Sequence, residues 1–176
     1  MSGQKILGPL VVFALLVLDQ ISKWWVLEFL FRPAAGLGDP HTFMQWLSSA
    51  PDRLPEVSLS LAPIFNLTMV WNFGISFGLM QGLGLILLLA ILGIIVGFSI
   101  WMIRSRAVPE ICALGLIVGG ALGNVADRLR FGAVADFLDF HVGGAHFPAF
   151  NVADAAISIG VVLLLLHGLF FAKKSA

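Results

Sequence analysis

Charged residues are scarce in this chain. Only 11% of its 176 residues are Asp, Glu, Lys or Arg, and the opposite charges balance to a net charge of zero. This balance gives no indication of a nucleic-acid partner. Cysteine is nearly absent as well, because Cys112 has no second cysteine with which to form a disulfide within the chain. A lone cysteine in an apolar stretch is most often a small packing residue.

Hydrophobic residues are correspondingly abundant. They make up 59% of the sequence, whereas about 45–50% is usual in soluble domains. An ordinary soluble domain is therefore excluded. The length predicts one domain, residues 1–176, and the hydrophobic content places that domain in a membrane.

Four apolar segments are each long enough to cross the ~30 Å hydrocarbon core, which takes ~20 helical residues. They are predicted at about residues 6–26, 83–103, 108–126 and 152–171. The first imitates a secretory signal, but Asp19 and Lys23 interrupt it and no small-residue cleavage site precedes Glu28. It is therefore predicted to be a retained helix. Small residues in the third segment would let neighbouring helices approach closely; they are Gly115, Gly119, Gly120 and Gly123.

Two longer loops connect these spans, at about residues 27–82 and 127–151. The first loop carries five prolines, so it cannot be a span. Its later part, residues 57–61 and 65–71, alternates or is rich in β-forming residues and predicts short strands. Residues 42–47 are predicted to form a short interfacial helix, because Trp favours the depth of the membrane interface.

The distribution of basic residues predicts the orientation. Five of them lie in short flanks on one side of the predicted spans: Lys5, Arg104, Arg106, Lys173 and Lys174. The other five are spread over two much longer stretches on the opposite side. Both termini are therefore predicted to be cytoplasmic. The ends of the first and third spans and the starts of the second and fourth would then share the outer face.

Five aspartates lie in or beside the apolar segments, and all of them fall towards this outer face: Asp19, Asp127, Asp136, Asp139 and Asp154. A carboxylate at the centre of a bilayer costs at least ~2.5 kcal/mol, so such residues indicate a functional site. Simpler roles remain open for some. Asp19 and Lys23 are one helical turn apart and could form a structural ion pair, or Lys23 could bind a substrate group. Asp127 could end a helix in a salt bridge with Arg128, and Asp139 is interpreted as an ordinary loop acid.

Asparagines and glycines accompany these acids. The block Asn72-Phe-Gly-Ile-Ser-Phe-Gly78 is as consistent with a turn as with a binding loop. Asn124 precedes Asp127 by three residues, so the two share a helix face. Asn151 is placed to cap the last helix, which would leave Asp154 free to point into the bundle. If residues 134–140 are extended, Asp136 and Asp139 face opposite ways.

Other catalytic chemistries find little support. His141 and His146 with nearby acids could be imagined as a metal cluster, but their spacing matches no zinc signature, and no metal site is predicted. The sequence has no Gly-x-Ser-x-Gly motif, so serine catalysis is disfavoured. Two carboxylates close together share one proton and can activate water against an amide.

The chain closely resembles the bacterial lipoprotein signal peptidase (signal peptidase II) family. Five ordered blocks carry the resemblance: Asp19-Gln-Ile-Ser-Lys23, Asn72-Phe-Gly-Ile-Ser-Phe-Gly78, Gly119-Gly-Ala-Leu-Gly-Asn-Val-Ala-Asp-Arg128, Val134-Ala-Asp-Phe137 and Phe150-Asn-Val-Ala-Asp154. The family implies an all-α membrane protein with four transmembrane helices, a small periplasmic β-cradle and an interfacial helix that together clamp the substrate peptide. The stretch between Arg32 and Val57 looks longer than is common in the family.

The resemblance also implies an activity. The family consists of aspartic endopeptidases of the inner membrane, which remove signal peptides from prolipoproteins before a diacylglyceryl-modified cysteine without a metal or cofactor. By motif, Asp136 and Asp154 are the expected catalytic pair. Supporting or substrate-binding roles are expected for Asp19, Lys23, Asn72, Gly74, Asn124, Asp127, Arg128, Asn151 and Ala153. Expected partners are prolipoproteins and membrane lipids, and the protein is expected to be a monomer.

Two hypotheses from other classes remain. A small proton-coupled transporter could use the acids as a relay, although that design expects carboxylates near the bilayer midplane. A structural scaffold would use the acids only to pair with Lys23, Arg128 and Arg130.

Overall fold

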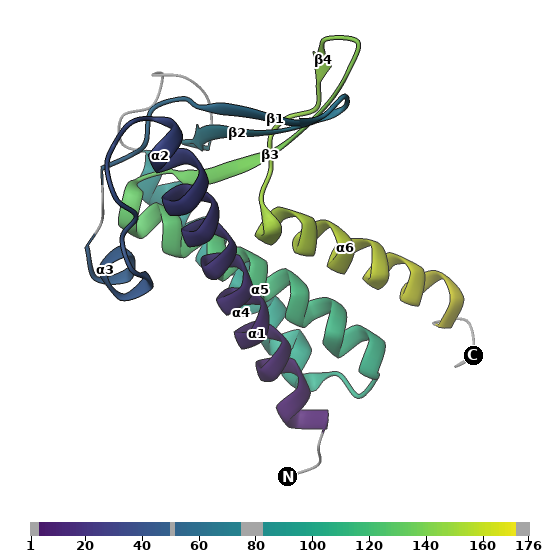
Figure 1. Cartoon of the computed structure of the whole chain (residues 1–176). Helices are drawn as coiled ribbons and strands as arrows, with labels where there is room; N and C mark the ends of the chain where they lie inside the picture. The colour runs from purple at the N-terminus through teal and green to yellow at the C-terminus, as the bar shows by residue number, and fades with distance from the viewer. Residues whose placement is uncertain (1–3, 50–51, 75–82, 172–176) are drawn as a thin grey trace. The chain divides into compact units, whose positions relative to one another are not determined.

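The computed structural model describes residues 4–49, 52–74 and 83–171, which are mostly helical with a small antiparallel sheet (Figure 1). Two compact units emerge from the contacts. The helical unit comprises Met1–Leu18, Ser76–Asn124 and Ala153–Ala176, and the sheet unit comprises Asp19–Ile75 and Val125–Val152. The prediction of a single domain stays a prediction.

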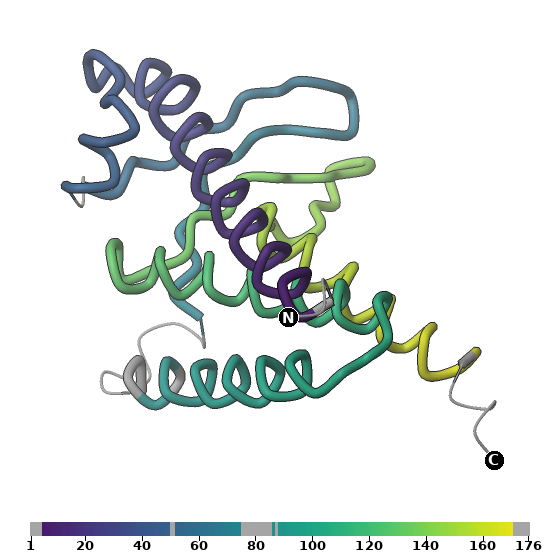
Figure 2. The backbone as a smooth tube through the Cα atoms, turned by 90° about the horizontal axis from the view of Figure 1, so that it is seen from below, coloured from purple at the N-terminus to yellow at the C-terminus, as the bar shows by residue number. Residues whose placement is uncertain are grey.

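Long helices occupy all four predicted apolar segments: α1 (Gln4–Trp25), α4 (Leu83–Arg104), α5 (Val108–Phe131) and α6 (Val152–Phe171). Among the described residues, three helical stretches are long and apolar enough to cross a membrane: Lys5–Ala34, Val108–Phe131 and Val152–Phe170. The apolar part of α4, Leu88–Arg104, is shorter. Figure 2 follows the chain from α4 through a short connection back into α5. The helical membrane architecture is thus confirmed, and the count of four spans stays a prediction.

Glycines in the helical unit let backbones approach closely, as predicted for α5. A Cβ atom on Gly120 would lie 2.5 Å from the carbonyl oxygen of Ala153 at the start of α6. A Cβ atom on Gly119 would lie 2.9 Å from the carbonyl oxygen of Val12 in α1. Gly160 of α6 has a similar role, since its Cβ would meet the carbonyl oxygen of Ala113 at 2.7 Å. These distances are too short for any side chain, so glycine permits this packing.

The first helical stretch is longer than predicted. The helix continues beyond Trp25 as a π-helical segment, η1 (Val26–Phe31), and then as α2 (Arg32–Ala34). The helix thus continues past residue 27, where the loop is predicted to begin, and α5 continues to Phe131, past the predicted span end at about residue 126. The bounds of the membrane spans stay a prediction. Val26, Leu27 and Phe31 are buried, and Glu28 forms a 2.6 Å ion pair with Arg32. The apolar residues of this extension pack against the sheet.

The sheet has four antiparallel strands in the order β1-β2-β3-β4. They are β1 (Ser58–Ala62), β2 (Phe65–Asn72), β3 (Val134–Val142) and β4 (Ala145–His146). The predicted strands at 57–61 and 65–71 are confirmed, and residues 134–140 are extended. Gly143 and Gly144, with φ of 60° and 84°, form the tight turn between β3 and β4.

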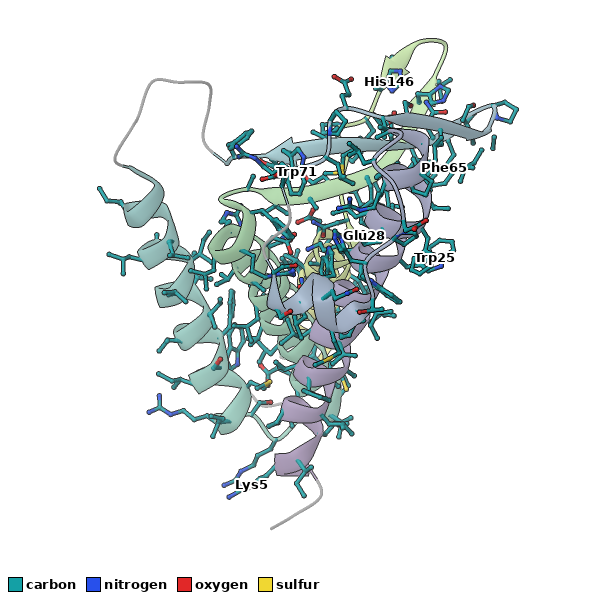
Figure 3. All side chains as sticks on the ribbon, turned by 60° about the vertical axis from the view of Figure 1, so that its left-hand side comes forward. Lys5, Trp25, Glu28, Phe65, Trp71 and His146 are labelled. Carbon is teal, nitrogen blue, oxygen red and sulfur yellow. The ribbon has the colours of Figure 1, made fainter. Side chains whose placement is uncertain are left out.

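The core of the sheet unit lies between the sheet and η1. Leu67 and Met69 of β2 and Phe137 of β3 pack in one cluster with Leu27 and Phe31. Figure 3 shows Glu28 on the helical segment beneath the sheet, and Phe65 and Trp71 on the strand β2. This packing fixes where β3, which carries Asp136, lies relative to the end of the first helix.

The predicted short helix is present as α3 (Phe43–Ser48). Thr42 caps it, since its hydroxyl accepts the backbone N–H of Gln45 while the Gln45 side chain accepts that of Thr42. Trp46, whose preference for the interface supported the prediction of an interfacial helix, is fully buried, and the Arg130 guanidinium lies 3.9 Å from its ring centroid. The interfacial location of α3 stays a prediction. Met44 and Leu47 are the exposed apolar residues of α3.

Candidate active site

Asp136 lies on β3 and is almost fully buried, with 1% exposure. The register places it opposite Val70 of β2, two residues before the end of that strand. Two asparagine amides donate to its carboxylate: Asn72 Nδ2 to Oδ2 at 3.0 Å and Asn151 Nδ2 to Oδ1 at 2.8 Å. Each oxygen of the carboxylate thus accepts a neutral N–H group, which fixes its orientation.

Asn72 is itself held in one orientation by Gly74. The backbone N–H of Gly74 donates to Asn72 Oδ1 at 2.9 Å, so the Asn72 amide nitrogen is turned towards Asp136. Gly74 has a φ of 80°, a left-handed conformation that a residue with a side chain rarely adopts. This hydrogen bond forms a tight turn at residues 72–74, and the choice between a turn and a binding loop for the whole motif stays open. Residues 75–78 of this motif lie outside the described residues.

Asn151 directly precedes α6, where it is predicted to cap the helix, and it is fully buried. The cap itself stays a prediction. The side-chain nitrogen of Asn151 donates to Asp136 and, at 3.3 Å, to the carbonyl oxygen of Ala135. Asn151 therefore connects the segment before α6 to β3, a contact that the sequence spacing did not reveal.

Asp154 lies in the first turn of α6, within the helical unit. Asn124 of α5 donates to it, with 2.8 Å between Asn124 Nδ2 and Asp154 Oδ1. Ala153 is fully buried, and its carbonyl oxygen lies where a side chain on Gly120 would stand. The glycine of α5 thus allows the first turn of α6 to approach closely enough for this hydrogen bond.

A buried ionic cluster joins the end of α1 to the end of α5. Lys23 Nζ lies 2.8 Å from Asp19 Oδ2 and 2.8 Å from Asp127 Oδ2, and all three side chains are fully buried. Gln20 Nε2 donates to Asp19 and to Asp127, both at 3.1 Å. The predicted Asp19–Lys23 pair is confirmed, and Asp127 belongs to the same cluster.

Asp127 also connects this cluster to the strand of Asp136. Its Oδ2 atom accepts the backbone N–H of Ala135 at 3.1 Å, one residue before Asp136. Arg128, the next residue along α5, is partly buried, and its carbonyl oxygen accepts the backbone N–H of Gly132 at 3.0 Å. Asp127 therefore anchors the start of β3, whereas the supporting role of Arg128 stays a prediction.

Asp139 is not an ordinary loop acid, so that interpretation is wrong. It lies on β3, is 5% exposed, and accepts a 2.8 Å hydrogen bond from Thr68 of β2. His146 of β4 lies 2.7 Å from it. Burial acts to raise the pKa of the Asp139 carboxyl, but the hydrogen bonds with His146 and Thr68 outweigh it and lower that pKa. Within the described residues, no three His, Cys, Asp or Glu side chains gather as metal ligands.

Two residues near this site were missed by the sequence reasoning. Gln20 was visible in the first motif, but its bond to Asp127 spans 107 residues of sequence. Arg130 stacks on Trp46, donates to the Trp46 carbonyl oxygen, and contacts Gln20 Oε1 at 3.4 Å. Neither contact follows from local spacing, since each joins segments that only the fold brings together.

The chain is similar to known proteins of one family. The sequence matches the family described as signal peptidase (SPase) II over residues 11–170. A lipoprotein signal peptidase of Methylorubrum extorquens is 42% identical over 92% of this chain and 85% of its own length. One of Rhizorhabdus wittichii is 41% identical over 93% of this chain and 86% of its own length.

A solved structure described as a bacterial membrane enzyme supports the fold. It has a TM-score of 0.70 at 24% identity, and the match covers 93% of each chain. The apolar helices and the family together identify a bacterial inner-membrane protein. The chain belongs to the signal peptidase II family and is a membrane peptidase.

Proposed function

We propose that this peptidase removes the signal peptide from prolipoproteins, cutting before a cysteine that carries diacylglycerol, with Asp136 and Asp154 as its catalytic pair. Family membership supports the substrate class, since the relatives are lipoprotein signal peptidases. One observation carries the choice of residues: asparagine amides hold both carboxylates, Asn72 and Asn151 at Asp136, and Asn124 at Asp154.

Amide donors suit carboxylates that must change protonation state. An amide N–H fixes the position of a carboxylate oxygen without adding a positive charge. A buried cation, by contrast, favours the ionised form alone. Two carboxylates held close together cannot both ionise easily, so the pair retains one proton. Such a pair supplies a general base and a general acid at once.

The proposed reaction uses both forms. The ionised carboxylate takes a proton from water while the water oxygen attacks the scissile carbonyl carbon. The protonated carboxyl donates its proton to the carbonyl oxygen, which gives a neutral tetrahedral gem-diol. The C–N bond then breaks as a carboxyl proton passes to the leaving amine nitrogen, and one gem-diol hydroxyl returns its proton to an ionised carboxylate of the pair, which leaves the new carboxyl group. One water is consumed, and the pair returns to its starting state with one proton.

The Lys23 cluster serves positioning in this proposal. Its three ionic side chains are fully buried and neutralise one another in part. Asp127 holds the N–H of Ala135 and so fixes the strand on which Asp136 lies. Asp127 therefore acts on catalysis through the position of β3.

The proposed orientation places both termini in the cytoplasm and the catalytic pair towards the periplasm. The basic residues that flank the spans support it, because Lys5, Arg104 and Arg106 lie in short segments on one side. In this arrangement α4 crosses the membrane as a fourth span. The sheet and α3 then form the periplasmic cradle and interfacial helix, with the exposed Met44 and Leu47 available to the substrate or the membrane. The protein acts as a monomer among membrane lipids.

The decisive experiment replaces each catalytic carboxylate. Asp136→Asn and Asp154→Asn are expected to lower cleavage of a purified, diacylglyceryl-modified prolipoprotein by at least about 10²–10⁴-fold, since each removes a proton-transfer group. Cleavage is measured in detergent with the full-length protein, and thermal unfolding checks that each variant is folded.

Asp39→Asn is the matched control, because Asp39 is exposed in the loop after α2. It should cleave at the wild-type rate. Full cleavage by either catalytic variant would refute the pair. Loss of cleavage without loss of pH-driven flux in proteoliposomes would instead revive the transporter, which family membership does not favour.

A further inference from the structure

A cavity of about 330 Å³ lies in the helical unit, and neither Asp136 nor Asp154 lines it. Its lining comes from the start of α1 and from the end of α4, the following connection and the start of α5. Ile111 of its lining is 13 residues before Asn124 on α5, which is about 20 Å along the helix. The proposed catalysis gives this cavity no role.

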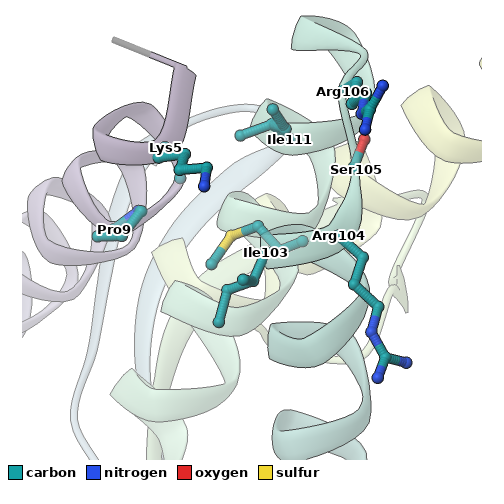
Figure 4. A pocket seen from close by; sticks show the side chains of 9 residues that line it. Lys5, Pro9, Ile103, Arg104, Ser105, Arg106 and Ile111 are labelled. Atoms are coloured by element: carbon teal, nitrogen blue, oxygen red, sulfur yellow. The ribbon is translucent and has the colours of Figure 1, made fainter. Parts of the chain in front are cut away.

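Three cations line this cavity: Lys5, Arg104 and Arg106. In Figure 4 Lys5 extends from α1 on one side, and Arg104, the last residue of α4, and Arg106, in the following connection, lie on the other. All three are exposed, and no ion pair joins any of them to a carboxylate of the described residues. They therefore hold unneutralised positive charge around one hollow.

Glu110 is the nearby acid, and its oxygens are engaged elsewhere. Its Oε1 accepts a 2.8 Å hydrogen bond from Trp101 Nε1, and its Oε2 accepts the hydroxyl of Ser105. The three cations of the cavity are therefore opposed by one carboxylate, Glu110, whose oxygens accept hydrogen bonds from neutral groups. The electrostatic balance of the cavity favours an anion.

Apart from Ser105, the remaining lining is apolar. Gly8, Pro9, Met102 and Ile111 form part of the cavity wall, and a Cβ on Gly8 would lie only 2.7 Å from Met102 Sδ. The cavity also lies where three apolar helical stretches begin or end, at Lys5, Arg104 and Val108. A ligand with both an anionic group and a hydrocarbon chain fits the three cations and the apolar wall of this cavity. Free phosphate would contact the cations alone.

We infer that this cavity binds the headgroup of an anionic phospholipid, whose phosphate lies among Lys5, Arg104 and Arg106 while an acyl chain follows the apolar wall. Basic pockets between the ends of transmembrane helices are suited to such headgroups. Arginine is well matched to a phosphodiester because its planar guanidinium can donate two parallel hydrogen bonds. The inference goes beyond the proposed catalysis, because it concerns lipid binding at another site.

The test measures lipid binding to the full-length protein by native mass spectrometry. Phosphatidylglycerol is compared with phosphatidylcholine of the same acyl chains. The wild type should prefer phosphatidylglycerol, and Arg104→Gln/Arg106→Gln should reduce that preference about 25-fold, since each cation near an anionic surface contributes about fivefold. Lys5→Gln should reduce the preference for phosphatidylglycerol about fivefold. This single variant provides the test if the double variant does not fold.

Three controls separate the possible sources of binding. Arg104→Lys/Arg106→Lys keeps the charge and should retain most of the preference. Lys173→Gln/Lys174→Gln removes the same charge from the C-terminal sequence and should retain all of it. Inorganic phosphate should not raise the Tm at concentrations where phosphatidylglycerol does. An unchanged preference in the glutamine variants, or stabilisation by phosphate alone, would overturn the inference; neither outcome bears on Asp136 and Asp154.

Discussion

The acids of this protein occupy two kinds of surroundings. Asp19 and Asp127 share the ammonium group of Lys23, at 2.8 Å from each, in a fully buried cluster. Asp136 and Asp154 receive hydrogen bonds from asparagine amides. A buried cation favours the ionised form of a carboxylate, whereas an amide N–H fixes the position of a carboxylate oxygen without adding a charge. We therefore propose that the acids paired with Lys23 support the structure and that the acids held by asparagine amides carry out the chemistry.

The strongest test of this comparison removes the cation. Lys23→Met should destabilise the protein by about 3–5 kcal/mol, because it leaves two buried carboxylates without their positive partner. The free energy of unfolding is measured by denaturant titration in mixed micelles. Lys23→Arg keeps the charge and should be less harmful. A folded Lys23→Met protein of normal stability would show that the cluster does not need its cation.

Asp127→Asn tests whether Asp127, an acid of the Lys23 cluster, positions the site without taking part in the reaction. The variant should lose about 1–3 kcal/mol of stability, since hydrogen bonds within the buried cluster are weakened while Lys23 still pairs with Asp19. Cleavage per folded molecule should stay within about tenfold of the wild type, far above that of Asp136→Asn. Complete loss of cleavage with an intact fold would reopen the assignment of the catalytic pair.

Gly120→Ala probes how the surroundings of Asp154 are built. The added Cβ would lie 2.5 Å from the Ala153 carbonyl oxygen, so α5 and α6 must separate. The expected cost is about 1–3 kcal/mol, with reduced cleavage because Asn124 moves away from Asp154. Gly93→Ala in α4 is the matched control, since no atom lies within 4 Å of its added Cβ. Equal stability of both variants would contradict the close packing.

The smallest effect is expected at Asp139, an acid that shares a strand with Asp136. Its lowered pKa means that the folded protein binds the proton less readily than the unfolded chain. The stability gained is therefore present above the ordinary carboxyl pKa and is lost as the pH falls through the lowered one. Asp139→Asn should cost about 1 kcal/mol or less at neutral pH, and the difference should vanish in strong acid. Unfolding measured across the acid range checks this.

Much of the fold follows from the sequence because apolar runs and strand patterns are local signals. The helices, the strands β1 and β2 and the short helix α3 were all predictable in this way. The extension of α1 through Phe31 was not, since it depends on burial of Leu27 and Phe31 against the sheet. The burial of Trp46 was not predictable for a similar reason, because Arg130, which covers it, is 84 residues away in sequence.

The candidate site shows the same limit. Motif spacing predicted the pair of Asp19 and Lys23, because one helix contains both residues. It did not predict that Asp127 joins them or that Asn151 reaches Asp136, since those contacts span the fold. The pairing of Asp136 with Asp154 rests on the family motifs and stays a proposal.

The hydrogen bond from Gly74 to Asn72 has a consequence for chemical ageing. An amide group offers a donor at one end and an acceptor at the other, and Gly74 fixes which end meets Asp136. Hydrolysis of that one amide to a carboxylate would replace the donor with a second negative charge beside Asp136. A mass increase of about one dalton, with the chain and its helices intact, would then alter the hydrogen bonding and charge around the carboxylate.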